Sequence, residues 1–184
     1  MFIGIGGCSR SGKSTLAEDL TWYYRCHNLR TIVLRQDDFV IKTDDIPVIK
    51  GQSDWDNPLS VDFGLVIETY KFLKNRFDVI IIDGLFAFYD NDLNKLYDKR
   101  ILVEISEVTF RTRRQAETRW GQEPDWFIDH VWESYLKFGI THNIDVKYPS
   151  EGFKPSERLH YSYLKISGES PFELDKIITY LSKI

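Results

Sequence analysis

A loop that can hold phosphate lies near the start of the chain, where residues 7–14 read GCSRSGKS. The segment matches the pattern GxxxxGK[ST], in which glycines let successive backbone N–H groups turn inward around a phosphate. It follows the apolar residues 2–6 and precedes residues with helical spacing, which is the context that the pattern requires. The start of a helix adds a partial positive charge. We therefore expect a nucleotide to bind here.

Two side chains of this loop have specific chemistry. Lys13 is expected to neutralise the β- and γ-phosphates of a nucleotide, and the Ser14 hydroxyl can ligate Mg²⁺. The sequence thus predicts ATP and Mg²⁺ as cofactors. The nucleotide-binding residues predicted from the loop are Gly7, Cys8, Ser9, Arg10, Ser11, Gly12, Lys13, Ser14 and Thr15.

Carboxylates follow two apolar segments further along the chain. Asp37 and Asp38 lie at the end of residues 31–39, TIVLRQDDF, and Asp83 ends DVIIIDG. A carboxylate at the end of such a strand can take a proton from an acceptor hydroxyl or help to hold Mg²⁺. The alternatives are a solvated acidic strand end and a turn-forming Asp-Gly pair. Because acids stand at the carboxyl ends of two predicted strands in one chain, we favour the catalytic interpretation.

Arginines are concentrated in the segment FRTRRQAETRW, residues 110–120. Guanidinium groups bind phosphate oxygens in pairs and suit the charge of a transferring phosphoryl group. Arg111, Arg113, Arg114 and Arg119 are therefore predicted to cover a bound nucleotide as a lid at about residues 108–125. A solvated basic helix is the alternative for any one of them.

The elements that position these residues alternate along the chain. Apolar strand-like runs cover residues 2–6, 31–39, 78–84, 100–106 and 161–167, and helical spacing covers residues 12–26, 60–75, 108–119, 125–139 and 170–184. Ser60 is expected to cap the second of these helices, and Pro171 to lie in the first turn of the last. This alternation predicts an α/β fold with a mostly parallel five-stranded sheet and helices on both faces. We expect one domain across residues 1–184. In such folds ligands bind beyond the carboxyl ends of the strands.

Composition narrows the class of protein. Hydrophobic residues make up 42% and charged residues 28% of the chain, as expected for a folded domain. The net charge of −4 argues against a nucleic-acid partner. The spacing of the two cysteines is not that of metal ligands. No run of apolar residues is long enough to span a membrane. The N-terminal segment MFIGIGG lacks the basic region of a signal peptide. We expect a cytoplasmic monomer or homodimer that acts on a small molecule.

Taken together, several segments resemble the nicotinamide riboside kinases, which belong to the uridine kinase-like P-loop nucleoside kinases. They are GCSRSGKST, QDDF, SDWDNPLSVD, IIIDGLFAF, the arginines and DHVWESYLKF, in this order. The phosphate loop alone is generic, whereas QDDF and HVWxxYLK are much narrower. The resemblance extends over roughly residues 2 to 175.

The resemblance implies a role for each matched residue. Asp37 would be the catalytic base and, with Ser14 and Asp83, would lie at the magnesium ion. Arg114 would contact both the phosphates and the acceptor, and Trp55 and Asp56 would contact the nucleoside. The remaining implied residues are Asp38, Phe39 and Val40 in the riboside pocket, Arg113 and Arg119 over ATP, and Gly168, Glu169 and Ser170 beside the adenine.

We therefore expect an ATP-dependent kinase that phosphorylates the 5′-hydroxyl of a ribonucleoside. Nicotinamide riboside, which would give nicotinamide mononucleotide, is favoured because a Trp face attracts a cationic pyridinium ring. Trp55 packed on the core is the alternative for that residue. A uridine/cytidine kinase, a nucleotide-binding regulatory protein without transfer activity and a plain ATPase remain open. His130 shows no partner in the sequence and is interpreted as a surface or core residue.

Overall fold

Five parallel strands form the central sheet of the computed structural model, which describes residues 1–117, 121–140 and 162–182. The order across the sheet is β2-β5-β1-β6-β7. The strands are β1 (Phe2–Gly7), β2 (Thr31–Arg35), β5 (Val79–Gly84), β6 (Lys99–Glu104) and β7 (Leu164–Ser167). The predicted mostly parallel five-stranded sheet is confirmed.

The central strands are apolar because both of their faces are covered. Every residue of β1 and of β5 is buried, as expected for parallel strands between two helical layers. The register pairs Ile3 with Ile81 and Ile5 with Asp83. The phosphate loop and Asp83 consequently leave the sheet at the same edge.

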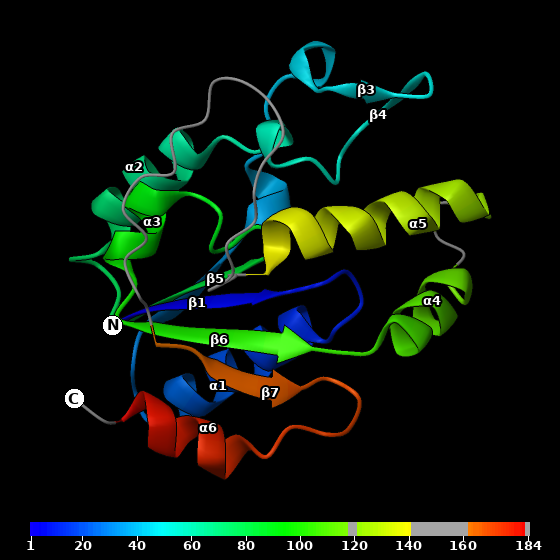
Figure 1. Cartoon of the computed structure of the whole chain (residues 1–184). Coiled ribbons are helices and arrows are strands. Elements are labelled where there is room, and N and C mark those ends of the chain that lie inside the picture. Colours follow the sequence, from blue (N-terminus) through cyan, green and yellow to red (C-terminus); the bar gives the residue numbers. More distant parts are fainter. Residues whose placement is uncertain (118–120, 141–161, 183–184) are drawn as a thin grey trace.

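Helices cover both faces of the sheet (Figure 1). One face carries α1 (Lys13–Cys26) and α6 (Leu174–Leu181), and the other carries α2 (Phe63–Leu73), α3 (Asn91–Leu96) and α5 (Asp125–Ser134). The helix α4 (Glu107–Gln115) follows β6 and lies beyond the carboxyl edge of the sheet.

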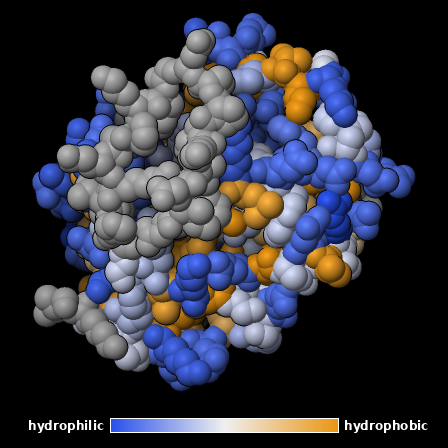
Figure 2. Space-filling model, viewed as in Figure 1, coloured by the Kyte–Doolittle hydropathy of each residue, from blue (hydrophilic) through white to orange (hydrophobic). Residues whose placement is uncertain are grey.

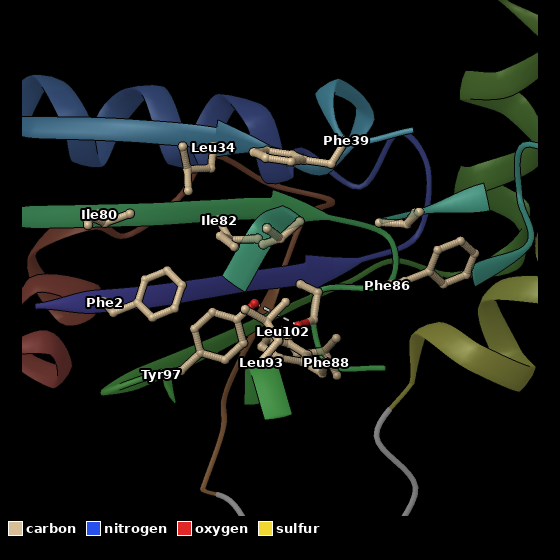
Figure 3. Close-up of a cluster of buried hydrophobic side chains, with 13 residues drawn as sticks. Phe2, Leu34, Phe39, Ile80, Ile82, Phe86, Phe88, Leu93, Tyr97 and Leu102 are labelled. Carbon is tan, nitrogen blue, oxygen red and sulfur yellow. Dashed lines mark hydrogen bonds between the residues drawn. The ribbon is translucent and has the colours of Figure 1, made fainter. Parts of the chain in front are cut away.

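The core is divided into layers by the alternation of side chains along each strand. Phe2, Leu34 and Ile80 point to one face and pack with residues of α2 and α3, as Figure 3 shows for part of this cluster. Ile3 and Ile81 point to the opposite face and pack against α1 and α6. The outer surface in the view of Figure 2 is mostly hydrophilic, with apolar residues in small separate groups.

Several element boundaries differ from the sequence expectation. Asp62, not Ser60, caps α2, because its carboxylate accepts a hydrogen bond from the Leu65 amide at 2.8 Å. The last helix begins at Leu174, so Pro171 precedes it rather than lying in its first turn. The helix predicted over residues 125–139 is α5 followed by one π-helical turn, Tyr135–Gly139.

Two elements were not predicted. Residues 40–58, which lack a regular pattern, contain the short hairpin of β3 (Val48–Ile49) and β4 (Gln52–Ser53). The helix α3 is capped by Asp90, which accepts a hydrogen bond from the Leu93 amide at 2.8 Å. Among the residues that the structure describes, no helix has the length and apolar character needed to cross a membrane.

Candidate active site

The phosphate loop connects β1 to α1 in the conformation that its glycines allow. Gly12 has a φ of 99°, in the left-handed region that favours glycine. A Cβ atom on Gly7 would lie 2.4 Å from the Val103 carbonyl oxygen, so a larger residue would not fit. The Lys13 ammonium donates a hydrogen bond to the Cys8 carbonyl oxygen at 2.9 Å. These contacts hold the lysine inside the loop, beside the first turn of α1.

Asp83 faces the same side of the sheet as α1. Successive strand residues alternate between faces, and Val79 and Ile81 of β5 pack against α1. Asp83 is two residues beyond Ile81, and therefore points to the face that carries α1. It is 5% exposed, and its Oδ1 atom has no hydrogen-bond partner within the described part of the chain.

Asp37 lies in a short 3₁₀ helix, Gln36–Asp38, that follows β2 directly. Desolvation by the surrounding protein raises the pKa of Asp37, and the negative charges of Asp83 and Asp38 raise it further, whereas Lys13 opposes the shift. Because these charges influence one another, Asp37, Asp83 and Lys13 form one electrostatic group. A carboxylate with a raised pKa is a stronger base than an ordinary aspartate.

The oxygen atoms of Ser14, Asp37 and Asp83 are ligands of the kind that Mg²⁺ prefers. The Ser14 hydroxyl and the carboxylates of Asp37 and Asp83 are oxygen ligands, and the unpartnered Asp83 Oδ1 is a buried acceptor that requires a partner. Across the described ranges, no group of three or more His, Cys, Asp or Glu side chains is placed to bind a metal. Mg²⁺ typically uses one or two carboxylates together with substrate phosphates, and the residues present match that arrangement.

A cavity of about 640 Å³ lies in front of the phosphate loop. Its walls come from the loop, from α1, from the segment after β2 and from the arginine-rich segment. It is lined by Ser9, Arg10, Gly12, Lys13, Ser14, Thr15, Asp37, Arg113, Arg114, Glu117 and Glu123. The structure therefore brings the predicted phosphate loop, one predicted acid and two predicted arginines to one space.

The two arginines reach the phosphate loop from the last turn of α4. Arg113 donates hydrogen bonds to the carbonyl oxygens of Arg10 and Gly168, at 3.0 and 2.8 Å. Arg114 donates to the Ser9 hydroxyl at 2.7 Å and makes a two-pronged ion pair with Glu123, at 2.5 and 2.7 Å. Arg119 lies outside the described residues.

The turn after β7 packs directly on the phosphate loop. Gly168 is buried, and a Cβ atom there would lie only 2.0 Å from the Ser11 carbonyl oxygen. Glu169 accepts hydrogen bonds from the Ser106 amide and the Thr109 hydroxyl, both at 2.8 Å, and these bonds lower its pKa to about 2. Ser170 is exposed next to them. The predicted adenine-side residues thus adjoin the predicted phosphate site.

Comparison with known proteins gives relatives named nicotinamide riboside kinase or uridine kinase. No family model matches the chain. The nicotinamide riboside kinase of Eremothecium gossypii is 24% identical, covering 73% of this chain and 74% of the relative. Nicotinamide riboside kinase 2 of Mus musculus is 26% identical, covering 90% and 94%. A uridine kinase of Lactobacillus helveticus is 22% identical, covering 100% and 95%. The resemblance to nicotinamide riboside kinases is confirmed.

Comparison with solved structures shows the fold. A possible uridine kinase from Bacillus stearothermophilus superposes with a TM-score of 0.51 at 17% sequence identity, covering 76% of this chain and 82% of that one. The chain has a P-loop kinase fold.

The predicted acceptor-side residues of this kinase fold lie in the turn after the β3–β4 hairpin. Trp55 is 48% exposed, so it is not packed on the core as one alternative expected. Asp56 is half-buried, and desolvation raises its pKa to about 6 although the positive charge of Arg114 acts in the opposite direction. The charge of Asp54 adds to the rise.

The segment after Asp37 is divided between core and surface. Asp38 is exposed. Phe39 is 9% exposed and packs in the core cluster of Figure 3, whereas Val40 is 37% exposed and forms an isolated bridge with Val61. Thus Asp38 and Val40 have exposed side chains, and Phe39 anchors the segment to the core.

Three residues of the site were missed by sequence reasoning. Glu117 and Glu123 line the cavity, where Glu117 is paired with Arg10. The alternation of acids and arginines in residues 111–123 is a weak signal for these pairs. His130 has a partner, contrary to expectation, because its Nε2 atom lies 2.7 Å from Asp54 Oδ1. A contact across 76 residues gives no local sequence signal.

Cys8 has the environment of an inert thiol. It is fully buried in the phosphate loop, and desolvation raises its pKa to about 11 despite the positive charge of Lys13. Since the thiolate is the reactive form, Cys8 contributes packing beside Phe110 and Val131 rather than nucleophilic chemistry.

Proposed function

We propose that this protein is an ATP-dependent kinase that transfers the γ-phosphate to the 5′-hydroxyl of a ribonucleoside, with nicotinamide riboside as the favoured acceptor. The observation that carries the proposal is the lining of one cavity by Lys13, Asp37 and Arg114. A cation for the phosphates, a base for the hydroxyl and a guanidinium for the developing charge are the three groups that such a transfer requires.

Each of these residues has a distinct task in the transfer. Lys13 and the loop amides bind the β- and γ-phosphates, and Arg113 and Arg114 stabilise the charge on the transferring group as part of a lid. Asp37 orients the acceptor hydroxyl and removes its proton. Ser14, Asp37 and Asp83 would hold Mg²⁺, which neutralises phosphate charge when bound.

The acceptor preference rests on Trp55 and Asp56. An exposed indole face and a neighbouring carboxylate attract a pyridinium ring through its positive charge, whereas neutral uracil would gain stacking alone. The relatives include proteins named nicotinamide riboside kinase and proteins named uridine kinase. A uridine/cytidine kinase is therefore the second candidate, because substrate choice depends on a few pocket contacts.

The decisive test is Mg²⁺-dependent consumption of ATP with a panel of acceptors. The panel contains nicotinamide riboside, nicotinic acid riboside, uridine, cytidine, adenosine and a control without acceptor. Selective turnover of the pyridine ribosides is expected. Turnover of uridine and cytidine instead would support the second candidate. Equal ATP loss with and without acceptors would indicate an ATPase, and tight ATP binding without any consumption would indicate a regulatory protein.

A further inference from the structure

One face of α5 contacts the segment that carries the predicted acceptor residues. Trp126, His130 and Ser134 are spaced four residues apart and therefore lie on one side of the helix. They contact Lys50, Asp54 and Asp56 in the same order: the first contact is a cation over a ring, and the other two are hydrogen bonds. The helix thus follows the hairpin end and the turn of residues 54–57, which we call the acceptor turn.

The central contact of this series is largely buried. His130 Nε2 lies 2.7 Å from Asp54 Oδ1, and the two side chains are 20% and 7% exposed. Asp54 also accepts a hydrogen bond from the Asn57 amide group at 3.2 Å, and its own backbone amide donates to the Pro47 carbonyl oxygen at 2.7 Å. Asp54 therefore joins α5 to both ends of the acceptor turn.

The flanking contacts restrict the same turn. The Lys50 ammonium lies 4.4 Å from the centroid of the Trp126 ring. The Ser134 hydroxyl donates a hydrogen bond to the Asp56 carbonyl oxygen, and the Ser60 hydroxyl donates to the Trp55 carbonyl oxygen at 3.1 Å. The backbone at Trp55 and Asp56 is thus held by partners outside the turn.

The side chains of the turn are not used by these contacts. The Trp55 ring is 48% exposed, and none of the ring contacts within the described ranges involves it. The Asp56 carboxylate is influenced by Arg114, Asp54, His130 and Glu123. The turn therefore has a fixed backbone and two side chains that remain available for a ligand.

We propose that His130 is a positioning residue for the acceptor: through Asp54 it fixes the acceptor turn so that Trp55 and Asp56 face the nucleoside. This inference rests on the proposed function, because it assigns the turn to the acceptor. A fixed turn lowers the entropy lost when the nucleoside is bound. ATP contacts none of these residues in the proposed arrangement, so binding of ATP should not depend on His130.

The experiment compares His130→Leu, which removes the hydrogen bond, with His130→Gln, which retains one donor. His27→Leu is the matched control, because His27 is exposed at the end of α1 and its ring packs beside Tyr23, away from the acceptor turn. We expect the KM for the acceptor to rise at least about 10-fold in His130→Leu. The value for His130→Gln should be intermediate, while kcat and the KM for ATP change less than about 2-fold.

The pairing itself is tested by Asp54→Asn. If His130 acts through Asp54, the double variant His130→Leu/Asp54→Asn should have the acceptor KM of Asp54→Asn alone, because the two changes remove one interaction. Additive effects of the two substitutions would overturn the assignment. An unchanged acceptor KM in folded His130→Leu, or equal losses for ATP and acceptor, would also overturn it.

Amide hydrogen exchange of residues 48–57 gives a readout that needs no activity. Exchange should be faster in His130→Leu than in the wild type and in His27→Leu, since the turn amides of Asp54 and Asn57 lose their support. Unchanged exchange would refute the positioning role even in an active enzyme. If the wild type phosphorylates no nucleoside, the proposed function fails, and exchange alone decides whether His130 fixes the turn.

Discussion

At the scale of single residues, the candidate site depends on charges that are brought together in a partly desolvated space. Lys13, Asp37 and Asp83 come from three different parts of the chain and influence one another electrostatically. Desolvation raises the pKa of Asp37, which makes its carboxylate a better base, and the positive charge of Lys13 opposes this rise. The chemistry therefore belongs to the group rather than to any one side chain.

Replacing Asp37 with Asn should abolish the base and preserve the shape of the site. We expect kcat to fall by about 10²–10⁴-fold, with most of the ATP binding retained because the phosphate loop, Ser14 and Asp83 are untouched. Steady-state kinetics and equilibrium ATP titration measure the two quantities. Asp19→Asn is the control, because Asp19 is exposed on α1 outside the cavity. Equal activity of the two variants would remove Asp37 from the mechanism.

The ionised Asp56 side chain should lower the free energy of unfolding, because the folded protein raises its pKa. An unfolded chain releases this proton near the ordinary pKa of 3.8 and the folded chain near 6. Ionisation therefore lowers the free energy of unfolding as pH rises between these values. The shift already includes the attraction to Arg114 and corresponds to roughly 3 kcal/mol at most, so Asp56→Asn should stabilise the protein by about 1–3 kcal/mol at pH 8.

Urea unfolding at pH 8 and at pH 4.5 tests this sign. The advantage of Asp56→Asn should shrink at the lower pH, where the folded wild type is already protonated at this position. Asp62→Asn is unsuitable as a control because Asp62 caps α2, whereas exposed Asp44 offers a matched surface change. A variant that is less stable at both pH values would show that the Asp56 charge contributes favourable contacts instead.

At the scale of elements, the sequence predicted strands and loops that depend on neighbouring residues, and it missed contacts between residues far apart in the chain. The runs FIGIG and VIIIDG indicate buried parallel strands because covering both faces requires apolar residues at every position. The phosphate loop follows from its own eight residues. Ser60 was wrong as a cap because Asp62 also lies before the helix and reaches the Leu65 amide. The contact between His130 and Asp54 joins distant segments, which periodicity cannot detect.

Docking of the turn after β7 onto the phosphate loop should be sensitive to one methyl group. In Gly168→Ala the added Cβ would lie 2.0 Å from the Ser11 carbonyl oxygen, so the two backbones must separate. We expect a loss of about 1–3 kcal/mol in stability and a larger rise in the KM for ATP than for the acceptor. Thermal unfolding and two-substrate kinetics measure these effects.

Gly64→Ala provides the comparison for Gly168→Ala. Gly64 lies in the first turn of α2, where the nearest atom to an added Cβ is an Asp62 oxygen at 3.3 Å. Alanine favours a helix over glycine, so this variant should keep its affinity for ATP. If both variants bound ATP equally well, the turn after β7 would have no part in the nucleotide site.

At the scale of the whole molecule, both layers of helices converge on one edge of the sheet. Because all five strands are parallel, the phosphate loop, Asp37 and Asp83 leave the sheet at the same end. The α1 layer supplies Lys13 and Ser14, and the segments around α4 and α5 supply the arginines and the support of the acceptor turn (Figure 1). Ligand binding at this edge should therefore stabilise the entire fold.

Mg²⁺-ATP should raise the melting temperature through Lys13. A ligand at 100 times its dissociation constant stabilises the folded state by about 2.7 kcal/mol, which corresponds to roughly 5–10 °C for a chain of this size. Lys13→Ala should lose most of this shift, while Lys71→Ala, on exposed α2 surface, should keep it. Removal of Mg²⁺ with EDTA should reduce the shift in the wild type, because the oxygen ligands Ser14 and Asp83 would no longer contribute to binding. If Mg²⁺-ATP raised the melting temperature of Lys13→Ala and of the wild type equally, the nucleotide would bind elsewhere on the molecule. The proposed transfer at the phosphate loop would then be wrong.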